Sequence, residues 1–459
     1  MSVLDPEIPT VSATATSPAP TGQSQSPHPS PAAVVSSGVP GHERPVPGYD
    51  IPPPTRPVGA RFAFGFALAQ LALFIALLGP VMISMAIKVT AIVGPDNATT
   101  AQGLILGVGA FAALIANPLF GRLSDRTTSR WGRRRPWMVG GSLALAAFLL
   151  VIALGTNVPT LIVGWFGAQL AANACFAAYL ATIADQVPPS QTAKISALGG
   201  VMQNVGILAS LYVAGLFTSS MVPLFMVPAA IGVVGMVVFA LLLPDQQLRT
   251  KPASDGLRSW VQTFWVSPRQ HPDFAWAFAS RFLLVLGSFM FSTFRFSWMT
   301  DHLSLSADEA AKKIFTGVLI YTVVLVVVGQ LAGIASDRAG RRKVFVLAST
   351  ALFAIGLGLL TQVSTVGHFY LVEAILGAAY GIYMGVDLAL VIAVLPNPED
   401  SAKDLGVFNI ANAGPQSLAP FVGALLIGGA AKNYDLLYLA AAALTFVGAL
   451  AILPVRKVK

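Results

Sequence analysis

The chain has 459 residues, of which 55% are hydrophobic and 10% are charged, and its mean hydropathy is +0.71. A water-soluble protein of this length requires far more polar surface, so the composition predicts a membrane protein. The formal net charge is +8, but the positive residues lie beside apolar segments and do not alternate with exposed aromatic residues, which argues against nucleic acid as a partner. With one cysteine, Cys175, the chain can form neither an intramolecular disulfide nor a cysteine-based zinc site.

Residues 1–58 differ from the rest of the chain in being rich in Pro, Ser, Ala and Thr. They contain no apolar stretch long enough for the core of a signal peptide. Such a segment cannot bury enough apolar area to offset its conformational entropy. We therefore predict a disordered tail, either a plain extension or a regulatory, partner-binding segment.

A bilayer with a hydrocarbon core about 30 Å thick requires roughly 20 apolar residues in each crossing helix. Twelve runs of the chain meet this requirement and predict an all-α membrane protein. These runs cover residues 62–89, 101–121, 136–155, 159–187, 195–218, 222–243, 274–300, 310–335, 344–362, 367–395, 404–429 and 434–454. An even number of crossings places both termini on the same side.

Lysine and arginine concentrate in alternate loops, beginning with six arginines from Arg122 to Arg135. The intervening loops hold few basic residues, so the positive-inside rule predicts a multi-pass protein of the cell membrane with both termini in the cytoplasm. Residues 244–273 then form a cytoplasmic connector between two six-helix bundles, residues 59–243 and 274–459. Every third run is almost free of charged residues and is expected to face lipid.

A short basic loop occurs twice, about half a chain apart, and each copy lies between two apolar runs. The first copy is Gly121-Arg122-Leu123-Ser124-Asp125-Arg126, followed by Gly132-Arg133-Arg134-Arg135, and the second is Gly333-Ile334-Ala335-Ser336-Asp337-Arg338, followed by Gly340-Arg341-Arg342-Lys343. A repeated, glycine-bounded basic turn in a hydrophobic chain indicates two similar membrane-embedded halves, which is the architecture of a transporter. We call these segments the repeated loops.

The residue types of the repeated loops are suited to gating. Glycine permits close helix approach, aspartate can pair with the positive end of a neighbouring helix, and arginine can hold carboxylates or lipid phosphates. Asp185 and Asp404, at helix ends on the same side, are the expected partners. We predict a latch between the bundles that forms in one state and is released in the other; static anchoring is the alternative. The predicted gating residues are Gly121, Asp125, Arg126, Arg133, Arg134, Asp185, Gly333, Asp337, Arg338, Arg341 and Arg342.

Charged residues within two apolar runs indicate a coupling site. Arg281 and Arg295 are fourteen residues apart in one run, and Glu373 and Asp387 are fourteen apart in another, so each pair lies on one helix face about 21 Å long. Because the two helices run in opposite directions, Arg281 should match Asp387 in depth, and Arg295 should match Glu373.

Such buried charges are costly unless they are paired, which makes simple packing a poor explanation for all four. We predict that one carboxylate exchanges its arginine partner for a proton as the cavity alternates. The alternative is that two fixed salt bridges brace the second half.

Uncharged polar residues in the runs are candidates for solute binding. Amide side chains can hydrogen-bond a polyhydroxylated ligand, and an aromatic ring can stack on a sugar ring, although many such groups bond only between helices. The candidate substrate-binding residues are Gln70, Asn117, Gln169, Asn173, Tyr380, Asn409, Asn412 and Gln416.

The repeated loops, the twelve runs and the every-third-helix pattern resemble the major facilitator superfamily over residues 60–455. The first repeated loop, through Pro136, resembles the version found in glycoside:cation symporters and sucrose-type proton symporters. Asn173 to Gln191 and Asp387 to Gln416 also resemble that branch, the latter its bacterial members. The resemblance implies two pseudo-symmetric six-helix bundles and proton-coupled symport of a small polar solute, a sugar or glycoside, by alternating access.

The chain also departs from these families. Melibiose-type sodium symporters carry carboxylates on the second helix, where this chain has Ala113 and Asn117. Sucrose-type symporters carry an arginine shortly before the aspartate that Asp185 matches, and here that neighbourhood is Ala178-Tyr179-Leu180. Sodium coupling is therefore not expected, and any proton-coupling charge must lie in the second half.

Two other functions stay open at this point. A drug or metabolite efflux antiporter has the same fold, but such proteins usually have a Gly-Pro-rich fifth helix, and Ile195 to Phe217 contains no proline. A non-transporting membrane scaffold or sensor is the second alternative. An enzyme is not expected, because the chain lacks a Gly-x-Ser-x-Gly elbow, a P-loop and a His-Glu-x-x-His motif. The expected partners are a small-molecule solute, a coupling proton and the lipid bilayer. No cofactor or metal is expected, and the sequence indicates no particular protein partner.

Overall fold

A computed structural model of the chain describes residues 54–248, 267–395, 401–428 and 431–456, which all belong to one compact unit. Most of the predicted tail and the centre of the predicted connector lie outside these residues. The side chains of Asp337, of residues 401–407 and of Asn409 are also outside the described part.

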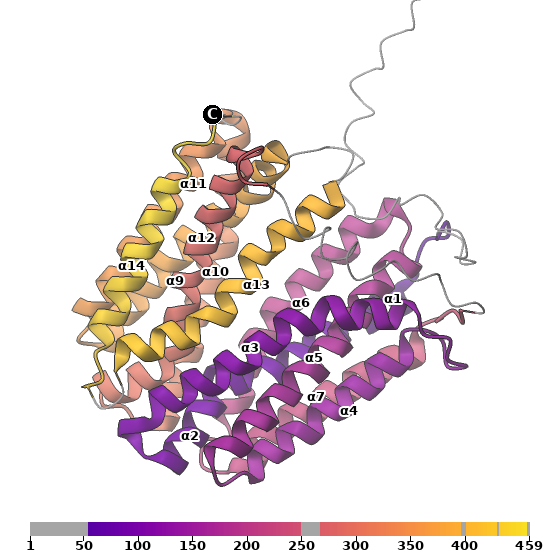
Figure 1. Cartoon of the computed structure of the whole chain (residues 1–459), viewed down its shortest axis with the longest axis horizontal. Coiled ribbons are helices and arrows are strands. Elements are labelled where there is room, and N and C mark those ends of the chain that lie inside the picture. Colours follow the sequence, from indigo (N-terminus) through magenta and orange to yellow (C-terminus); the bar gives the residue numbers. More distant parts are fainter. Residues whose placement is uncertain (1–53, 249–266, 396–400, 429–430, 457–459) are drawn as a thin grey trace, which may run out of the picture. The chain divides into compact units, whose positions relative to one another are not determined.

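The first half consists of helices joined by short turns (Figure 1). Its first span is composite, because α1 passes through a π-helical turn, Pro80–Ser84, directly into α2. The helices of this half are α1 (Ala60–Gly79), α2 (Met85–Val93), α3 (Pro95–Asp125), α4 (Arg135–Leu154), α5 (Val158–Gln186), α6 (Pro189–Gly215) and α7 (Met221–Leu242).

The second half repeats this order of long helices. These are α9 (Pro272–His302), α10 (Ala307–Ala339), α11 (Arg342–Leu359), α12 (Val366–Val394), α13 (Ser401–Ile427) and α14 (Tyr434–Ala451), with a short 3₁₀ turn, Leu360–Gln362, after α11. The described residues contain twelve helical spans that are long and apolar enough to cross a membrane. The predicted fold class is confirmed, with helix ends shifted by a few residues from the predicted runs.

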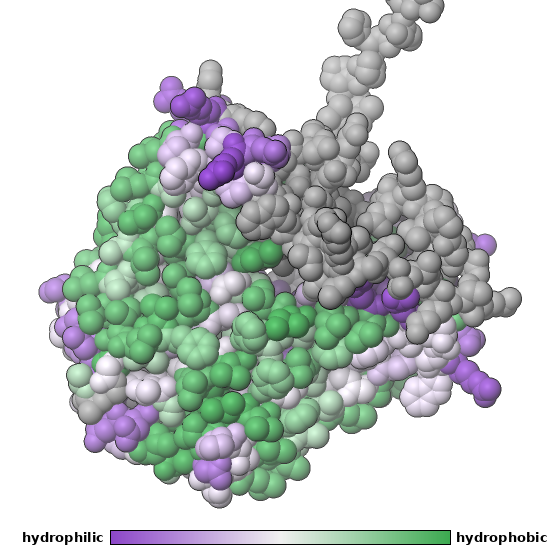
Figure 2. Space-filling view, in the orientation of Figure 1, coloured by the Kyte–Doolittle hydropathy of each residue, from purple (hydrophilic) through white to green (hydrophobic). Residues whose placement is uncertain are grey.

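The helices that the sequence assigned to lipid, α4, α7, α11 and α14, make their main contacts within their own half. Helix α4 packs mainly on α5 and α7, and α11 packs mainly on α12 and α14. Figure 2 shows a continuous hydrophobic surface over the α11 and α14 side, with hydrophilic residues toward the ends of the helices. The exposed apolar residues there include Ile355, Leu439, Phe446, Val447 and Leu450. A surface of this kind requires acyl chains and not water as its solvent.

We call the end of the helices that carries the repeated loops the basic end, and the other the opposite end. The main contacts between the halves pair α3 with α13, α6 with α10, and the π-helical turn with α9; Figure 1 shows α3 and α13 side by side. Gly103 approaches Ala424 and the Pro420 carbonyl so closely that a Cβ at Gly103 would collide with both. The absent side chain is what lets these two helices touch.

A buried glutamine joins the halves at the same level. Gln102 Nε2 donates to the Thr293 carbonyl over 3.2 Å, and the Ser297 hydroxyl donates to Gln102 Oε1 over 3.2 Å. Ser417 Oγ donates to the Ala110 carbonyl at 2.8 Å. Gln102, Thr293 and Ser297 lie in the parts of α3 and α9 nearer the opposite end, whereas Ala110 is at the middle of α3. The described hydrogen bonds between the halves therefore lie at the middle of the molecule and toward the opposite end.

Replacing Gly103 with leucine should force the halves apart at the opposite end, because overpacking a tight contact costs about 1–3 kcal/mol. A shift of that size changes the population of the closed state by about tenfold. The measurement is the rate at which an impermeant maleimide labels a cysteine placed at Ala110, in a chain whose own Cys175 is buried.

The matched control is Gly140→Leu, because an added Cβ at Gly140 meets no atom within 4 Å. Equal labelling rates in the two leucine variants would show that the α3–α13 contact does not close the opposite end.

Candidate transport site

The two charge pairs that helix depth predicts are both present. Arg281 Nη1 lies 3.2 Å from Asp387 Oδ2, and Arg295 Nη1 lies 2.7 Å from Glu373 Oε1. Both pairs join α9 to α12 within the second half. The pairing is therefore confirmed, whereas the coupling role stays a prediction.

The Arg281–Asp387 pair belongs to a network that spans three helices. Arg281 Nε donates to Asn412 Oδ1 of α13 at 2.9 Å, and the guanidinium lies 5.1 Å from the centre of the Phe408 ring. The Tyr383 hydroxyl donates a hydrogen bond to the Asp387 carboxylate. The Arg281 and Asp387 side chains are 16% and 8% exposed, so this pair is partly open to its surroundings.

The Arg295–Glu373 pair is sealed more tightly. Glu373 is 0% exposed, and its Oε2 atom has no hydrogen-bond partner among the described residues. The Arg295 guanidinium lies 5.1 Å from the centre of the Phe291 ring. A buried carboxylate with one unpartnered oxygen is energetically costly, and a bound proton would cancel its charge.

Glycines bring α12 against α10 and so set the position of both carboxylates. Cβ atoms added at Gly377, Gly381 and Gly385 would meet the backbones of Tyr321, Leu325 and Gly329 at 2.5 Å. The four-residue spacing creates a flat stripe that permits backbone contact between helices. This stripe was not among the predicted features, although its four-residue spacing is visible in the sequence.

Several candidate solute-binding residues of the first half take part in helix packing. Gln70 Nε2 lies 3.4 Å from Gln203 Oε1 and so links α1 to α6, and Asn173 donates to the Gln169 carbonyl of its own helix at 2.9 Å. Gln169 is buried and packs against Gly109 of α3. Asn117 is half-buried.

The candidate solute-binding residues of the second half lie in different environments. Gln416 is exposed, whereas Asn412 is held by Arg281. The half-buried Tyr380 has the rings of Tyr321, Phe353 and Tyr383 around it, with centroids 5.9–6.4 Å away. The Asn409 side chain lies outside the described part of the chain.

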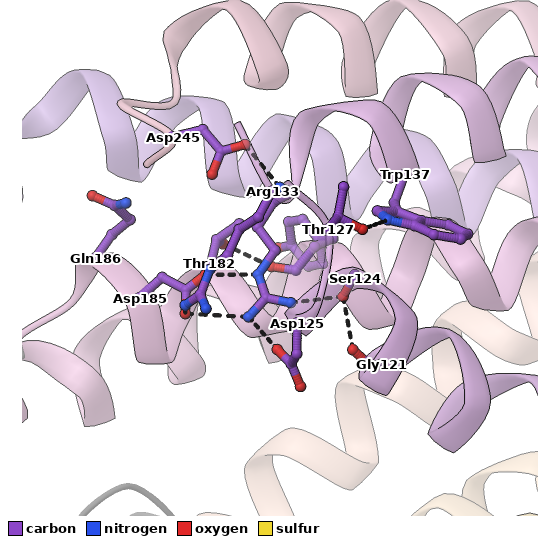
Figure 3. Close-up of polar contacts among 12 residues, drawn as sticks. Gly121, Ser124, Asp125, Thr127, Arg133, Trp137, Thr182, Asp185, Gln186 and Asp245 are labelled. Carbon is purple, nitrogen blue, oxygen red and sulfur yellow. Dashed lines mark hydrogen bonds and ion pairs between the residues drawn. The ribbon is translucent and has the colours of Figure 1, made fainter. Parts of the chain in front are cut away.

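Arginines of the first repeated loop form ion pairs with nearby carboxylates (Figure 3). Arg133 forms an ion pair with Asp185 of α5. Arg134 Nε donates to the same carboxylate at 2.7 Å, its Nη2 lies 2.6 Å from Asp125 Oδ1, and its Nη1 donates to the Ser124 hydroxyl at 2.6 Å. This network ties the end of α3 to the end of α5 at the start of α4.

Arg134 stays charged in this network. Burial opposes its charge, but Asp185 and Asp125 outweigh that effect and raise the pKa of the guanidinium above its ordinary value. The network therefore keeps its cation at any pH a cell experiences.

Asp245, which the sequence analysis missed, fastens the same loop to the end of α7. Its Oδ2 atom accepts the backbone N–H groups of Arg134 at 2.8 Å and Arg135 at 2.9 Å, where α4 begins. A carboxylate at this place satisfies unpaired helix N–H groups and complements the helix dipole. Gly132, with φ +98°, passes so close to Asp245 that a Cβ there would collide with the carboxylate.

The second repeated loop makes an equivalent attachment by different chemistry. Lys343 Nζ donates to the carbonyls of Leu453 and Val455, just after α14. In the first half, Arg135 donates to the Leu243 carbonyl, just after α7. Each repeated loop thus fixes the third span of its half to the end of the sixth.

In the described arrangement these contacts lie within the first half, and the latch between the halves stays a prediction. The described contacts of Arg134 and Asp185 join parts of the first half, because both carboxylate partners lie at neighbouring helix ends of that half. In the second loop, Arg338 and Arg341 are exposed and Arg342 is half-buried. The side chains of Asp337 and Asp404 lie outside the described residues.

Twelve apolar spans in two similar halves, with paired charges buried between helices, define a membrane transporter. The sequence profile of the Major Facilitator Superfamily matches residues 62–332 and 277–459. The chain belongs to this superfamily and is a multi-pass membrane transporter of a small-molecule solute.

Solved structures support the fold across nearly the whole chain. A variant of the nucleoside transporter NupG matches with a TM-score of 0.68 and 14% identity, over 86% of this chain and 99% of that one. A bacterial homolog of the human lysosomal transporter Spinster, in an inward-facing and unoccupied conformation, matches with a TM-score of 0.66 and 12% identity, over 86% and 98% of the two chains. At these identities the likeness concerns the fold alone.

Curated relatives match only short segments. An uncharacterized symporter of Synechocystis sp. is 52% identical over 46 residues, which are 10% of this chain and 8% of the relative. The sucrose transport protein SUC4 of Arabidopsis thaliana is 39% identical over 57 residues, which are 12% of this chain and 10% of the relative. The chain therefore covers about a tenth of the length of these relatives.

Replacing Asp245 with alanine should lower the stability of the first half. The substitution removes the acceptor for two helix N–H groups, and loss of such a cap costs about 1–2 kcal/mol. The check is the thermal unfolding midpoint of the purified protein.

Asp96→Ala is the matched control, because Asp96 is an exposed aspartate in the first turn of α3. If both variants unfold at the same temperature, the Asp245 contacts contribute nothing beyond those of a surface carboxylate.

Proposed function

We propose that this transporter is a proton-coupled symporter of a sugar or glycoside, working by alternating access in the cell membrane. The observation that carries the proposal is the Arg281–Asp387 pair, which lies within the membrane spans yet is partly exposed. A carboxylate in this position can bind a proton and release its arginine, which links proton binding to a change in the solute site.

The coupling step follows from electrostatics. In the deprotonated state Asp387 holds Arg281, which also binds Asn412. A proton on the Asp387 carboxylate cancels its charge and removes the main attraction for the guanidinium. Arg281 and Asn412 are then available to hydrogen-bond solute hydroxyl groups.

The candidate polar residues favour a neutral, hydroxyl-rich solute. Asn117, Asn412 and Gln416 offer both donors and acceptors, as sugar hydroxyls require. The name of one curated relative, a sucrose transport protein, supports this class of solute, and the name of the other supports symport.

The described arrangement corresponds to one state of the transport cycle. The described hydrogen bonds between the halves lie at the middle of the molecule and toward the opposite end, and positive-inside topology assigns the basic end and both termini to the cytoplasm. On this assignment the halves are closed to the outside. We infer that the Arg134–Asp125 contact is exchanged for one with the second half when the basic end closes.

Asp387→Asn should abolish uphill solute accumulation while leaving solute exchange across the membrane intact, because asparagine cannot bind and release a proton. The assay uses proteoliposomes with an imposed pH gradient and labelled sugars or glycosides. Asp435→Asn, at an exposed aspartate of α14, is the matched control. Unchanged accumulation by Asp387→Asn would contradict the coupling role.

The same assay separates the symporter from an efflux antiporter. A symporter accumulates solute when the outside is acidic, whereas an antiporter expels it under that gradient. Expulsion by the wild-type protein would overturn the proposed direction of coupling.

Asp125→Asn should slow turnover without preventing membrane insertion. The Asp125–Arg134 contact of 2.6 Å is partly exposed, so its loss should change the equilibrium between states by about 1 kcal/mol and the rate by roughly fivefold. The measurement is the initial rate of exchange per inserted protein. Turnover equal to that of an Asp96→Asn control would show that Asp125 has no role in gating.

A further inference from the structure

Three tyrosines lie between the two charge pairs of the second half. Tyr380 and Tyr383 belong to α12, between Glu373 and Asp387, and Tyr321 belongs to the adjacent α10. Tyr321 and Tyr380 are half-buried and Tyr383 is buried. Their hydroxyl groups have no part in the proposed coupling step, and their arrangement calls for an explanation.

Helix packing brings Tyr321 between Glu373 and Tyr380. A Cβ added at Gly377 would lie 2.5 Å from the Tyr321 carbonyl oxygen and 2.9 Å from its Cα atom. Gly377 is four residues after Glu373 and three before Tyr380, so Tyr321 faces the turn of α12 that separates them. Tyr321 also interacts electrostatically with Glu373 and with Tyr380.

The line continues from Tyr380 to Asp387. The ring centroids of Tyr321 and Tyr380 are 6.4 Å apart, and those of Tyr380 and Tyr383 are 6.0 Å apart. The Tyr383 hydroxyl then bonds the Asp387 carboxylate. Rings at this spacing allow their hydroxyl groups to connect directly or through one water molecule.

The charged groups lie at the two ends of this line. Glu373 is faced by Arg295 from α9, by Tyr321 from α10 and by Tyr438 from α14. Asp387 is faced by Arg281 from α9 and by the tyrosines of its own helix. Helix α11 contributes the Phe353 ring, which packs on Tyr380. A phenol can donate one hydrogen bond and accept another, so a row of phenols can pass a proton between two carboxylates.

We propose that Tyr321, Tyr380 and Tyr383 form a proton relay between Glu373 and Asp387. The relay rests on the proton coupling proposed above and names the route by which the proton reaches the solute site. A proton leaves the Glu373 carboxylic acid through a bridging water for the Tyr321 oxygen, as the proton of Tyr321 passes on to Tyr380. The same exchange through Tyr383 delivers a proton to Asp387. Each tyrosine keeps one proton, Glu373 becomes a carboxylate paired with Arg295, and Asp387 becomes neutral.

The relay runs inside the second half and not through the space between the halves. Thr293 and Ser297 of α9 contact Gln102 of the first half, whereas Arg295 lies about 200° around the helix from Thr293. The Arg295–Glu373 pair therefore lies on the side of α9 that faces away from the Gln102 contact between the halves. A proton on this route passes the depth at which the halves are in contact, and the halves do not have to separate and admit the solute.

The deciding variant is Tyr321→Phe, which removes one hydroxyl and keeps the ring. Tyr370→Phe is the matched control, because Tyr370 is a half-buried tyrosine of α12 outside the line. Proteoliposomes report pH-gradient-driven accumulation, solute exchange without a gradient, and the ratio of accumulation rates in H₂O and D₂O. We expect Tyr321→Phe to lose at least tenfold in accumulation while exchange stays at the control level. Tyr380→Phe should lose accumulation to the same degree.

Each outcome decides the proposal. Accumulation and an H₂O/D₂O ratio in Tyr321→Phe equal to those of Tyr370→Phe would overturn the relay while leaving proton symport intact. Equal losses of exchange and accumulation in Tyr321→Phe would also overturn it, because the hydroxyl would then serve the solute or the fold. Failure of the wild-type protein to accumulate any tested sugar or glycoside under a pH gradient would contradict the proposed function itself, and the relay with it.

Discussion

The cost of placing charge in an apolar environment organises the second half of this transporter. An isolated charge within the membrane spans costs several kcal/mol, so Arg281 and Arg295 must each find a carboxylate at their own depth. The two pairs bind α9 to α12 at two levels, and the glycine stripe of α12 binds that helix to α10. One pair is partly exposed and bonded to Asn412 and Tyr383, whereas the other is deeply buried, with one Glu373 oxygen that has no partner among the described residues. This difference supports different tasks for the two carboxylates.

The halves are similar in architecture and different in chemistry. Each repeated loop fixes the third span of its half to the end of the sixth, through Arg135 and Asp245 in one half and Lys343 in the other. The first half carries amide side chains and the arginine network at the basic end, whereas the second half carries the buried charge pairs. Protonation of a carboxylate in the second half would change contacts within one bundle relative to the other, which is suited to coupling.

Closure at the opposite end depends on small residues and a single buried amide. Gly103 permits contact between α3 and α13, and Gln102 satisfies both of its polar functions across the boundary between the halves. Contacts of this kind are specific yet uncharged, so they can separate without exposing an unpaired ion. The described ion pairs, including Lys432–Asp301 and Lys312–Asp308 at the opposite end, join residues of the same half.

The sequence by itself determined the twelve spans, the two halves and the pairing of Arg281 with Asp387 and Arg295 with Glu373, because hydropathy and helical periodicity act locally and charges must match in depth. Only the tertiary structure decided that Asp185 serves both Arg133 and Arg134 within one half, since a loop arginine can reach several carboxylates and the sequence does not rank them. The contacts of Asp245 and Tyr321 were likewise decided only by the tertiary structure. Each is distant in the chain from the groups it meets, and the contacts exist because glycines such as Gly132 and Gly377 bring separate backbones together. Close packing between distant segments has no period along the chain, and for that reason it becomes visible only in three dimensions.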